Sequence, residues 1–143
     1  MSKQRSAQEV VEIGVGFAAE GSTGVAYAAI HGGPNLHPIR VPFAVRRIAG
    51  LDGRDVAYAA LRAVARTIRE RIDGPVRFAL SDASLVADVA ERRMLPVALT
   101  MPYVALRCQL NRFPSADVRF SASPEIVDLA ARATAEASLH VAA

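Results

Sequence analysis

The sequence predicts an α/β domain in which a mixed sheet of five strands is flanked by helices. Three segments with the two-residue alternation of strands follow one another near the N-terminus, and helical and strand-like segments then alternate along the chain. Consecutive strands pair antiparallel, whereas strands separated by helices join a sheet in parallel. The chain has 143 residues, enough for one domain with its own core. We therefore expect residues 1–143 to form a single domain, with residues 1–8 flexible.

The first three strands are predicted from their alternation and from the turn between the first two. Residues 10–17 place apolar side chains on one face and Glu or Gly on the other, and the turn-like sequence AEGSTG separates them from a second apolar run at residues 25–30. These two strands should form an antiparallel hairpin. Residues 39–48 alternate again, and Pro42, which has no N–H to donate to a neighbour, indicates an edge strand.

Helices and strands alternate in the rest of the chain. Apolar residues recur every three or four positions in the helical segments and every second position in the strands. Asp-Gly-Pro ends the longest helical pattern, and Ser-Pro-Glu begins the last one. The predicted segments are a helix at residues 54–72, a strand at 76–80, a helix that then runs to Arg93, a helix at 103–112, a strand at 117–121 and a final helix from Pro124 to about His140.

Composition and charge limit the kinds of partner and the cellular location that the sequence allows. The formal net charge is +3, with Lys3 the only lysine, and this modest excess permits a partner that carries phosphate without demanding one. Cys108 is the only cysteine, so no internal disulfide can form, and its apolar-periodic surroundings predict a buried thiol. No run approaches the roughly 18 apolar residues of a membrane span, and residues 1–6 lack the apolar core of a signal peptide. We therefore expect a cytoplasmic protein with no membrane partner.

An acidic turn joins the fourth strand to the helix that follows it. Asp82 stands there between Ser81 and Ser84. Short polar side chains at such a junction can cap the helix by accepting hydrogen bonds from its first free N–H groups. The carboxyl ends of strands in open α/β sheets are also where ligands and metals bind. Asp82 is therefore compatible with a helix cap and with a functional carboxylate.

Short motifs, together with the order of elements, resemble the ribonuclease H-like superfamily. Residues 81–86, SDASLV, are similar to the T-D-S-x-x-V sequence that ends the fourth strand of that family, and residues 127–130, VDLA, are similar to its A-D-x-L-A in the last helix. Residues 110–120, LNRFPSADVRF, resemble the segment that leads into the fifth strand. The resemblance covers nearly the whole chain and implies the ribonuclease H-like fold of the type 1 enzymes.

The resemblance also implies a site of four carboxylates that holds two divalent cations, Mg²⁺ or Mn²⁺, for phosphodiester hydrolysis. Asp82 stands at the third of these positions and Asp128 at the fourth. Gly14 occupies the place of the first-strand aspartate, and Val56 occupies the place of the glutamate on the long helix. Because two carboxylates neutralise too little of the charge of two cations, such a site should bind its metal weakly.

Two other acids could substitute for the missing pair. Glu12 is two residues from Gly14 and therefore on the same face of the strand, and Asp55 adjoins Val56 in the first turn of the long helix. The family's mobile catalytic histidine has no evident counterpart, and the chain lacks tryptophan and the basic insertion that some members use to grip hybrid duplexes. The sequence thus leaves both an inactive protein and an enzyme open.

Three functions fit these observations. The one that we favour is a degenerate ribonuclease H-fold protein, inactive or weakly active, that is retained to bind nucleic acid or a protein partner. A row of arginines on the long helix, Arg62, Arg66 and Arg69, could contact phosphates, although such a row is also typical of a solvated helix face. The second function is a divalent-metal-dependent ribonuclease that cleaves RNA in RNA/DNA hybrids with the help of Glu12 or Asp55. The third is a homo-oligomeric module that associates through the sheet edge or the Ala-rich final helix.

Overall fold

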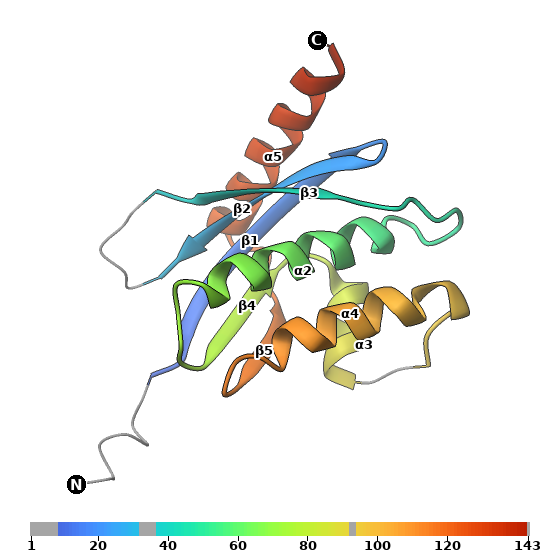
Figure 1. The fold of residues 1–143 in the computed structure, drawn as a ribbon. Helices are drawn as coiled ribbons and strands as arrows, with labels where there is room; N and C mark the ends of the chain where they lie inside the picture. The colour runs from blue at the N-terminus through green and yellow to red at the C-terminus, as the bar shows by residue number, and fades with distance from the viewer. Residues whose placement is uncertain (1–8, 32–36, 92–93, 143) are drawn as a thin grey trace, which may run out of the picture.

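A computed structural model describes residues 9–31, 37–91 and 94–142, so the predicted flexibility of residues 1–8 lies outside the described residues. A five-stranded sheet forms the middle layer, with helix α5 on one face and helices α2, α3 and α4 on the other (Figure 1). Among the described residues, no helix has the length and apolar character needed to cross a membrane.

The sheet has the strand order β3-β2-β1-β4-β5, which confirms the predicted mixed sheet. Strand β1 pairs antiparallel with β2, and β2 pairs antiparallel with β3, whereas β1 pairs parallel with β4 and β4 with β5. Pro42 lies in β3 at the edge of the sheet, as its missing N–H predicts. The strands are β1 (Val11–Glu20), β2 (Thr23–Ile30), β3 (Ile39–Ala44), β4 (Val76–Leu80) and β5 (Ala116–Phe120).

The helices follow the predicted order, but several of their ends differ from the prediction; α2, for example, ends at Arg69 rather than at residue 72. Helix α2 begins after Gly53, whose φ of 83° lies in the left-handed region that glycine adopts without strain, and no side chain caps it. Helix α4 begins three residues before the predicted start because Pro102 falls in its first turn, where a missing N–H costs nothing. The helices are α2 (Arg54–Arg69), α3 (Ala83–Glu91), the 3₁₀ turn η1 (Val97–Leu99), α4 (Thr100–Leu110) and α5 (Pro124–Ala142).

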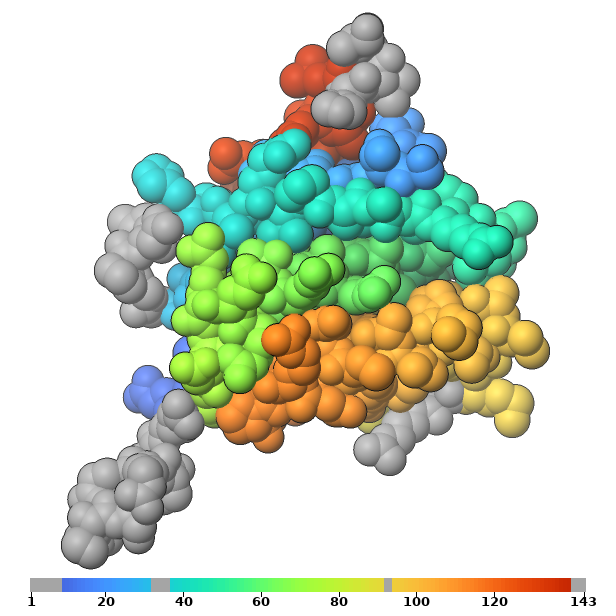
Figure 2. Space-filling view, viewed as in Figure 1, coloured from blue at the N-terminus to red at the C-terminus, as the bar shows by residue number. Residues whose placement is uncertain are grey.

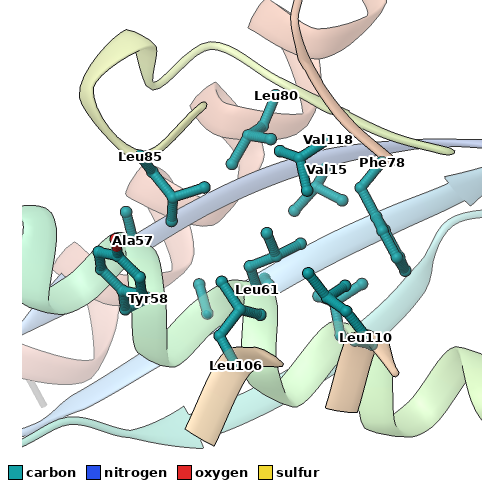
Figure 3. Packing of buried hydrophobic residues seen from close by; sticks show 14 of the residues in the cluster. Val15, Ala57, Tyr58, Leu61, Phe78, Leu80, Leu85, Leu106, Leu110 and Val118 are labelled. Carbon is teal, nitrogen blue, oxygen red and sulfur yellow. The ribbon is translucent and has the colours of Figure 1, made fainter. Parts of the chain in front are cut away.

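The larger hydrophobic cluster lies between the sheet and the layer of α2, α3 and α4 (Figure 3). Leu61 of α2, Phe78 of β4 and Leu106 of α4 have no exposed surface. The outer side of α4 is not covered, and Cys108 there is exposed. The expectation of a buried thiol is therefore wrong, because α4 packs through Leu106 and Leu110 and turns the opposite side to solvent.

The second cluster lies between α5 and the other face of the sheet, mainly over β1 and β2. Ile126, Leu129 and Ala133 of α5 are buried there. At Gly16 of β1 the helix comes unusually close: a Cβ at that position would lie 2.2 Å from the backbone nitrogen of Ala130. Glycine therefore allows the backbone of α5 to rest directly on β1.

Candidate functional site

Gly14 marks the place in β1 where the resemblance puts the first catalytic aspartate. Its backbone is buried, and it pairs with Ala79 of β4. A Cβ built on Gly14 would point toward α5, 2.8 Å from Cδ1 of Ile126 and 3.4 Å from Oε1 of Glu125. An apolar side chain of α5 thus fills the space through which a carboxylate on this strand would extend.

Asp82 follows β4 and serves as the N-terminal cap of α3. Its Oδ1 accepts a hydrogen bond of 2.9 Å from the backbone N–H of Leu85, and its carbonyl oxygen accepts one of 3.1 Å from Val86. The side chain is partly exposed. The capping role that the sequence allowed is therefore confirmed.

Asp128 lies on the exposed side of α5, one turn after Glu125. Glu125 contacts the end of β2: its Oε1 lies 2.5 Å from Nε2 of His31, and both side chains are about half exposed. The sequence assigned Glu125 only to the first turn of the helix. The carboxylate nearest to Gly14 on α5 is therefore Glu125 rather than the predicted Asp128.

Val56 is buried in α2, and the adjacent Asp55 stabilises the loop that precedes this helix. Asp55 is 4% exposed; its Oδ2 accepts hydrogen bonds from the backbone N–H of Ile48 at 2.7 Å and from Nε of Arg47 at 3.1 Å. Burial opposes ionisation of the carboxyl group, but these bonds and one from the N–H of Val56 outweigh it and lower the pKa. Asp55 thus points toward the loop before α2.

Glu12 lies on the α5 face of β1, two residues before Gly14. Its Oε2 accepts a hydrogen bond of 2.7 Å from Nε of Arg119 on β5. This hydrogen bond is the main reason that the pKa of Glu12 is lowered. Both acids that could substitute for the missing pair, Glu12 and Asp55, are therefore bound to arginines.

These positions test whether the chain could hold the metal ions that the resemblance implies. Within the parts of the chain that the structure describes, no three His, Cys, Asp or Glu side chains are placed so that they could hold a metal ion. Ile126 also occupies the space next to Gly14 into which a metal-binding carboxylate on β1 would extend. The described residues do not fit a two-metal centre.

The three arginines of α2 have different surroundings. Arg62 and Arg66 are exposed and line a groove of about 470 Å³ between α2 and β3. Arg69 instead fixes the C-terminal end of the helix: its Nε donates to the carbonyl oxygen of Arg112 at 2.9 Å, and its Nη1 donates to Asp73 at 2.7 Å. Only the first two arginines are thus presented to a partner at this groove.

A buried polar cluster joins α2 to α3, and the sequence analysis did not identify it. Asp88 is 1% exposed, and its carboxylate accepts hydrogen bonds of 3.0 Å from Nη1 of Arg54 and from the hydroxyl of Tyr58. Burial, followed by the bond to Asp88, raises the pKa of Tyr58. Tyr58 and Leu85 of α3 belong to the same buried cluster (Figure 3). One feature of the sequence could have indicated this cluster: Asp88 is an acidic residue on the apolar face of α3, next to Val89.

Comparisons with known proteins bear on the fold. No family model matches the chain, and no curated protein matches it. Among solved structures, RNase H1 from the halophilic archaeon Halobacterium salinarum is 13% identical, with a TM-score of 0.66 over 90% of this chain and 99% of that chain. The N-terminal RNase H domain of Rv2228c from Mycobacterium tuberculosis, solved as a fusion with maltose-binding protein, is 12% identical, with a TM-score of 0.60 over 87% of this chain and 95% of that chain.

A third solved structure is LC11-RNase H1 in complex with an RNA/DNA hybrid. It is 12% identical, with a TM-score of 0.56 over 89% of this chain and 98% of that chain. All three similarities span nearly the full length of both chains, and they agree with the strand order β3-β2-β1-β4-β5 and its flanking helices. The chain has a ribonuclease H-like fold.

Proposed function

We propose that this chain is a ribonuclease H-fold protein with an incomplete acidic site, inactive or only weakly active as a nuclease, that binds nucleic acid. The observation that carries the loss of activity is the contact at Gly14, where Ile126 of α5 fills the space of the first-strand carboxylate. The resemblance places Val56, which is buried in α2, at the position of a second carboxylate. The chemistry of two-metal hydrolysis needs both cations held in place, and the described acids do not converge to hold them.

The nuclease half of the proposal is tested on an end-labelled RNA/DNA hybrid with Mg²⁺ and, separately, with Mn²⁺. We expect cleavage by the wild type to be no greater than cleavage by Asp82→Asn. Asparagine caps helices about as well as aspartate, so this substitution removes the charge of Asp82 and leaves α3 intact.

Asp117→Asn is the matched control, because it removes an exposed carboxylate of β5 that lies 3.5 Å from Arg77 of β4. Cleavage that Asp82→Asn abolishes and Asp117→Asn preserves would overturn the proposal. It would establish the alternative, a metal-dependent ribonuclease acting on hybrids, and the search for further ligands would then turn to Glu12, Asp55 and Glu125.

The binding half of the proposal rests on the groove between α2 and β3. Arg62 and Arg66 are one helical turn apart on the exposed side of α2, and no described acid forms an ion pair with either of them. Arginine is well suited to phosphate because its planar group donates two parallel hydrogen bonds. The structural neighbour LC11-RNase H1 was solved with an RNA/DNA hybrid, and this makes a hybrid the first ligand to test.

Replacing both groove arginines should weaken nucleic-acid binding and its salt dependence together. Each phosphate contact contributes about 0.9 to the slope of log K against log salt concentration, so the slope for Arg62→Gln/Arg66→Gln should fall by about 2. The measurement is a titration of a fluorescent RNA/DNA hybrid at several salt concentrations.

The control variant Arg71→Gln/Arg132→Gln also removes two exposed positive charges, but neither residue lines the groove. We expect this control to change the slope much less. An equal loss in both variants would show that overall charge, and not the groove, attracts the hybrid. Wild-type protein that fails to bind hybrid at low salt would refute the binding half outright.

A further inference from the structure

A second hollow adjoins the groove between α2 and β3. It has a volume of about 590 Å³ and is lined by the segment that follows β3, the first half of α2, η1 and the first half of α4. We call it the α2–α4 hollow. Ala44, Ala59 and Arg62 line both the hollow and the groove, so the two form one continuous depression along α2. Figure 2 shows this side of the molecule, where α2, in green, lies between the teal β3 and the orange α4.

The α2–α4 hollow has the size and the lining of a site for a flat apolar group. Pockets that bind organic ligands measure about 300–1,000 Å³ and are lined mainly by apolar side chains. Asp55 and Tyr58, which line the hollow, are only 4% and 1% exposed, so it extends down to side chains that the protein largely buries. Its apolar walls include Ile48, Ala98, Met101, Pro102 and Ala105.

The charged side chains of the α2–α4 hollow favour an anion at its mouth. Arg46 and Arg62 line the hollow, both are exposed, and neither forms an ion pair with a described acid. Of the described residues that line it, only Asp55 is acidic. Its carboxylate already accepts hydrogen bonds from Arg47 and from two backbone N–H groups. Because Arg47 balances Asp55, the other two arginines give this part of the surface a net positive charge.

The positive charge continues beyond the hollow into the groove between α2 and β3. Arg66 lies there one helical turn after Arg62, so three exposed arginines line the whole depression. Glu70 lines the far end of the groove; it is one turn from Arg66 but about 12 Å along the helix axis from Arg62. A row of cations suits a chain of phosphates better than a ligand with a single anionic group.

We propose that this depression binds single-stranded nucleic acid: an unpaired base enters the α2–α4 hollow while neighbouring phosphates contact Arg46, Arg62 and Arg66. The inference rests on the nucleic-acid binding proposed above and specifies its ligand. An unpaired base can leave its stack and pack between apolar side chains in a pocket. The bases of a hybrid duplex are paired and stacked in its interior. A hybrid therefore contacts the arginines through its phosphates but leaves the hollow empty.

The test compares one fluorescent RNA strand, free and annealed to its DNA complement, in anisotropy titrations at several salt concentrations. Ala105→Phe places a ring in the α2–α4 hollow and alters neither an arginine nor the groove between α2 and β3. It should weaken binding of the free strand about tenfold, the effect of losing one stacked base, and leave hybrid binding within about twofold. The salt dependence of free-strand binding should stay the same, because packing a base releases no counterions.

Ala105 is partly buried, so the exposed Ala98 of η1 provides a second variant that fills the hollow from its rim. Ala98→Phe should have the same selective effect, and it decides the question if circular dichroism shows that Ala105→Phe does not fold. Ala135→Phe is the matched control, because it makes the same substitution at an exposed alanine of α5, on the other face of the sheet. It should change the affinity for neither ligand.

An abasic strand of the same length separates the contribution of the base from that of the phosphates. The variants that fill the hollow should not weaken its binding, whereas Arg62→Gln/Arg66→Gln should. Filled variants that bind the free strand as the wild type does, or that lose affinity equally for the free strand and for the hybrid or the abasic strand, would overturn the inference and leave nucleic-acid binding itself in place. Wild-type protein that binds neither the free strand nor the hybrid at low salt would refute both proposals.

Discussion

Replacing Gly16 with alanine is expected to destabilise the protein by about 3 kcal/mol or more, the upper range for overpacking a core. The added Cβ would lie 2.2 Å from the nitrogen of Ala130 and 2.4 Å from the carbonyl carbon of Leu129. These are backbone atoms, so no rotamer change can relieve the clash, and α5 must move away from β1. Urea unfolding followed by circular dichroism measures the loss.

The control for this prediction is Gly21→Ala, in the turn between β1 and β2. No atom lies within 4 Å of a Cβ at Gly21, but its φ of 62° is unfavourable for alanine. The expected cost is about 1 kcal/mol, which reports backbone conformation alone. Similar losses at Gly16 and Gly21 would mean that α5 does not rest on β1 as closely as described.

Replacing Asp88 with alanine should cost about 3–5 kcal/mol, the range for breaking a buried ion pair by removing one partner. The carboxylate accepts hydrogen bonds from Arg54 and Tyr58, and its loss leaves both donors facing a cavity between α2 and α3. The effect should appear as a lower midpoint of thermal unfolding.

Two further variants locate the source of that loss. Tyr58→Phe removes one donor and keeps the pairing of Asp88 with Arg54, so about 1–2 kcal/mol is expected. Asp117→Ala removes an exposed carboxylate that lies 3.5 Å from Arg77 and should change stability by less than about 1 kcal/mol. A loss in Asp88→Ala no greater than that in Asp117→Ala would contradict the assignment of a buried cluster.

Much of the fold could be predicted from the sequence because hydrophobic spacing reports which face of each element is buried. The alternation in residues 39–48 and the proline within it gave both the strand β3 and its place at the edge. The strand is shorter than predicted, ending at Ala44, because the neighbouring strand β2 begins at Thr23, the residue that pairs with Ala44. Spacing is a property of neighbouring residues, so it marks elements better than it marks their ends.

The surroundings of the site residues were much harder to predict. The resemblance alone places Gly14 where the family has an acid. The contact of Ile126 with this position depends on segments that are far apart in the chain, so the sequence does not reveal it. The same holds for Glu12, whose partner Arg119 is 107 residues away. Cys108 shows the complementary error: an apolar spacing indicates a helix face but does not say whether the molecule itself covers that face.

The packing of α5 on β1 and β2 also bears on how the protein is made. Tyr27 of β2 and Glu136 of α5 are hydrogen-bonded across 109 residues of sequence. During synthesis the first hairpin therefore leaves the ribosome long before the helix that shields one of its faces. That face must stay exposed, or be held by a chaperone, until α5 has been translated. A transcript truncated before α5 would yield a chain with an uncovered apolar sheet, a natural target for proteolytic quality control.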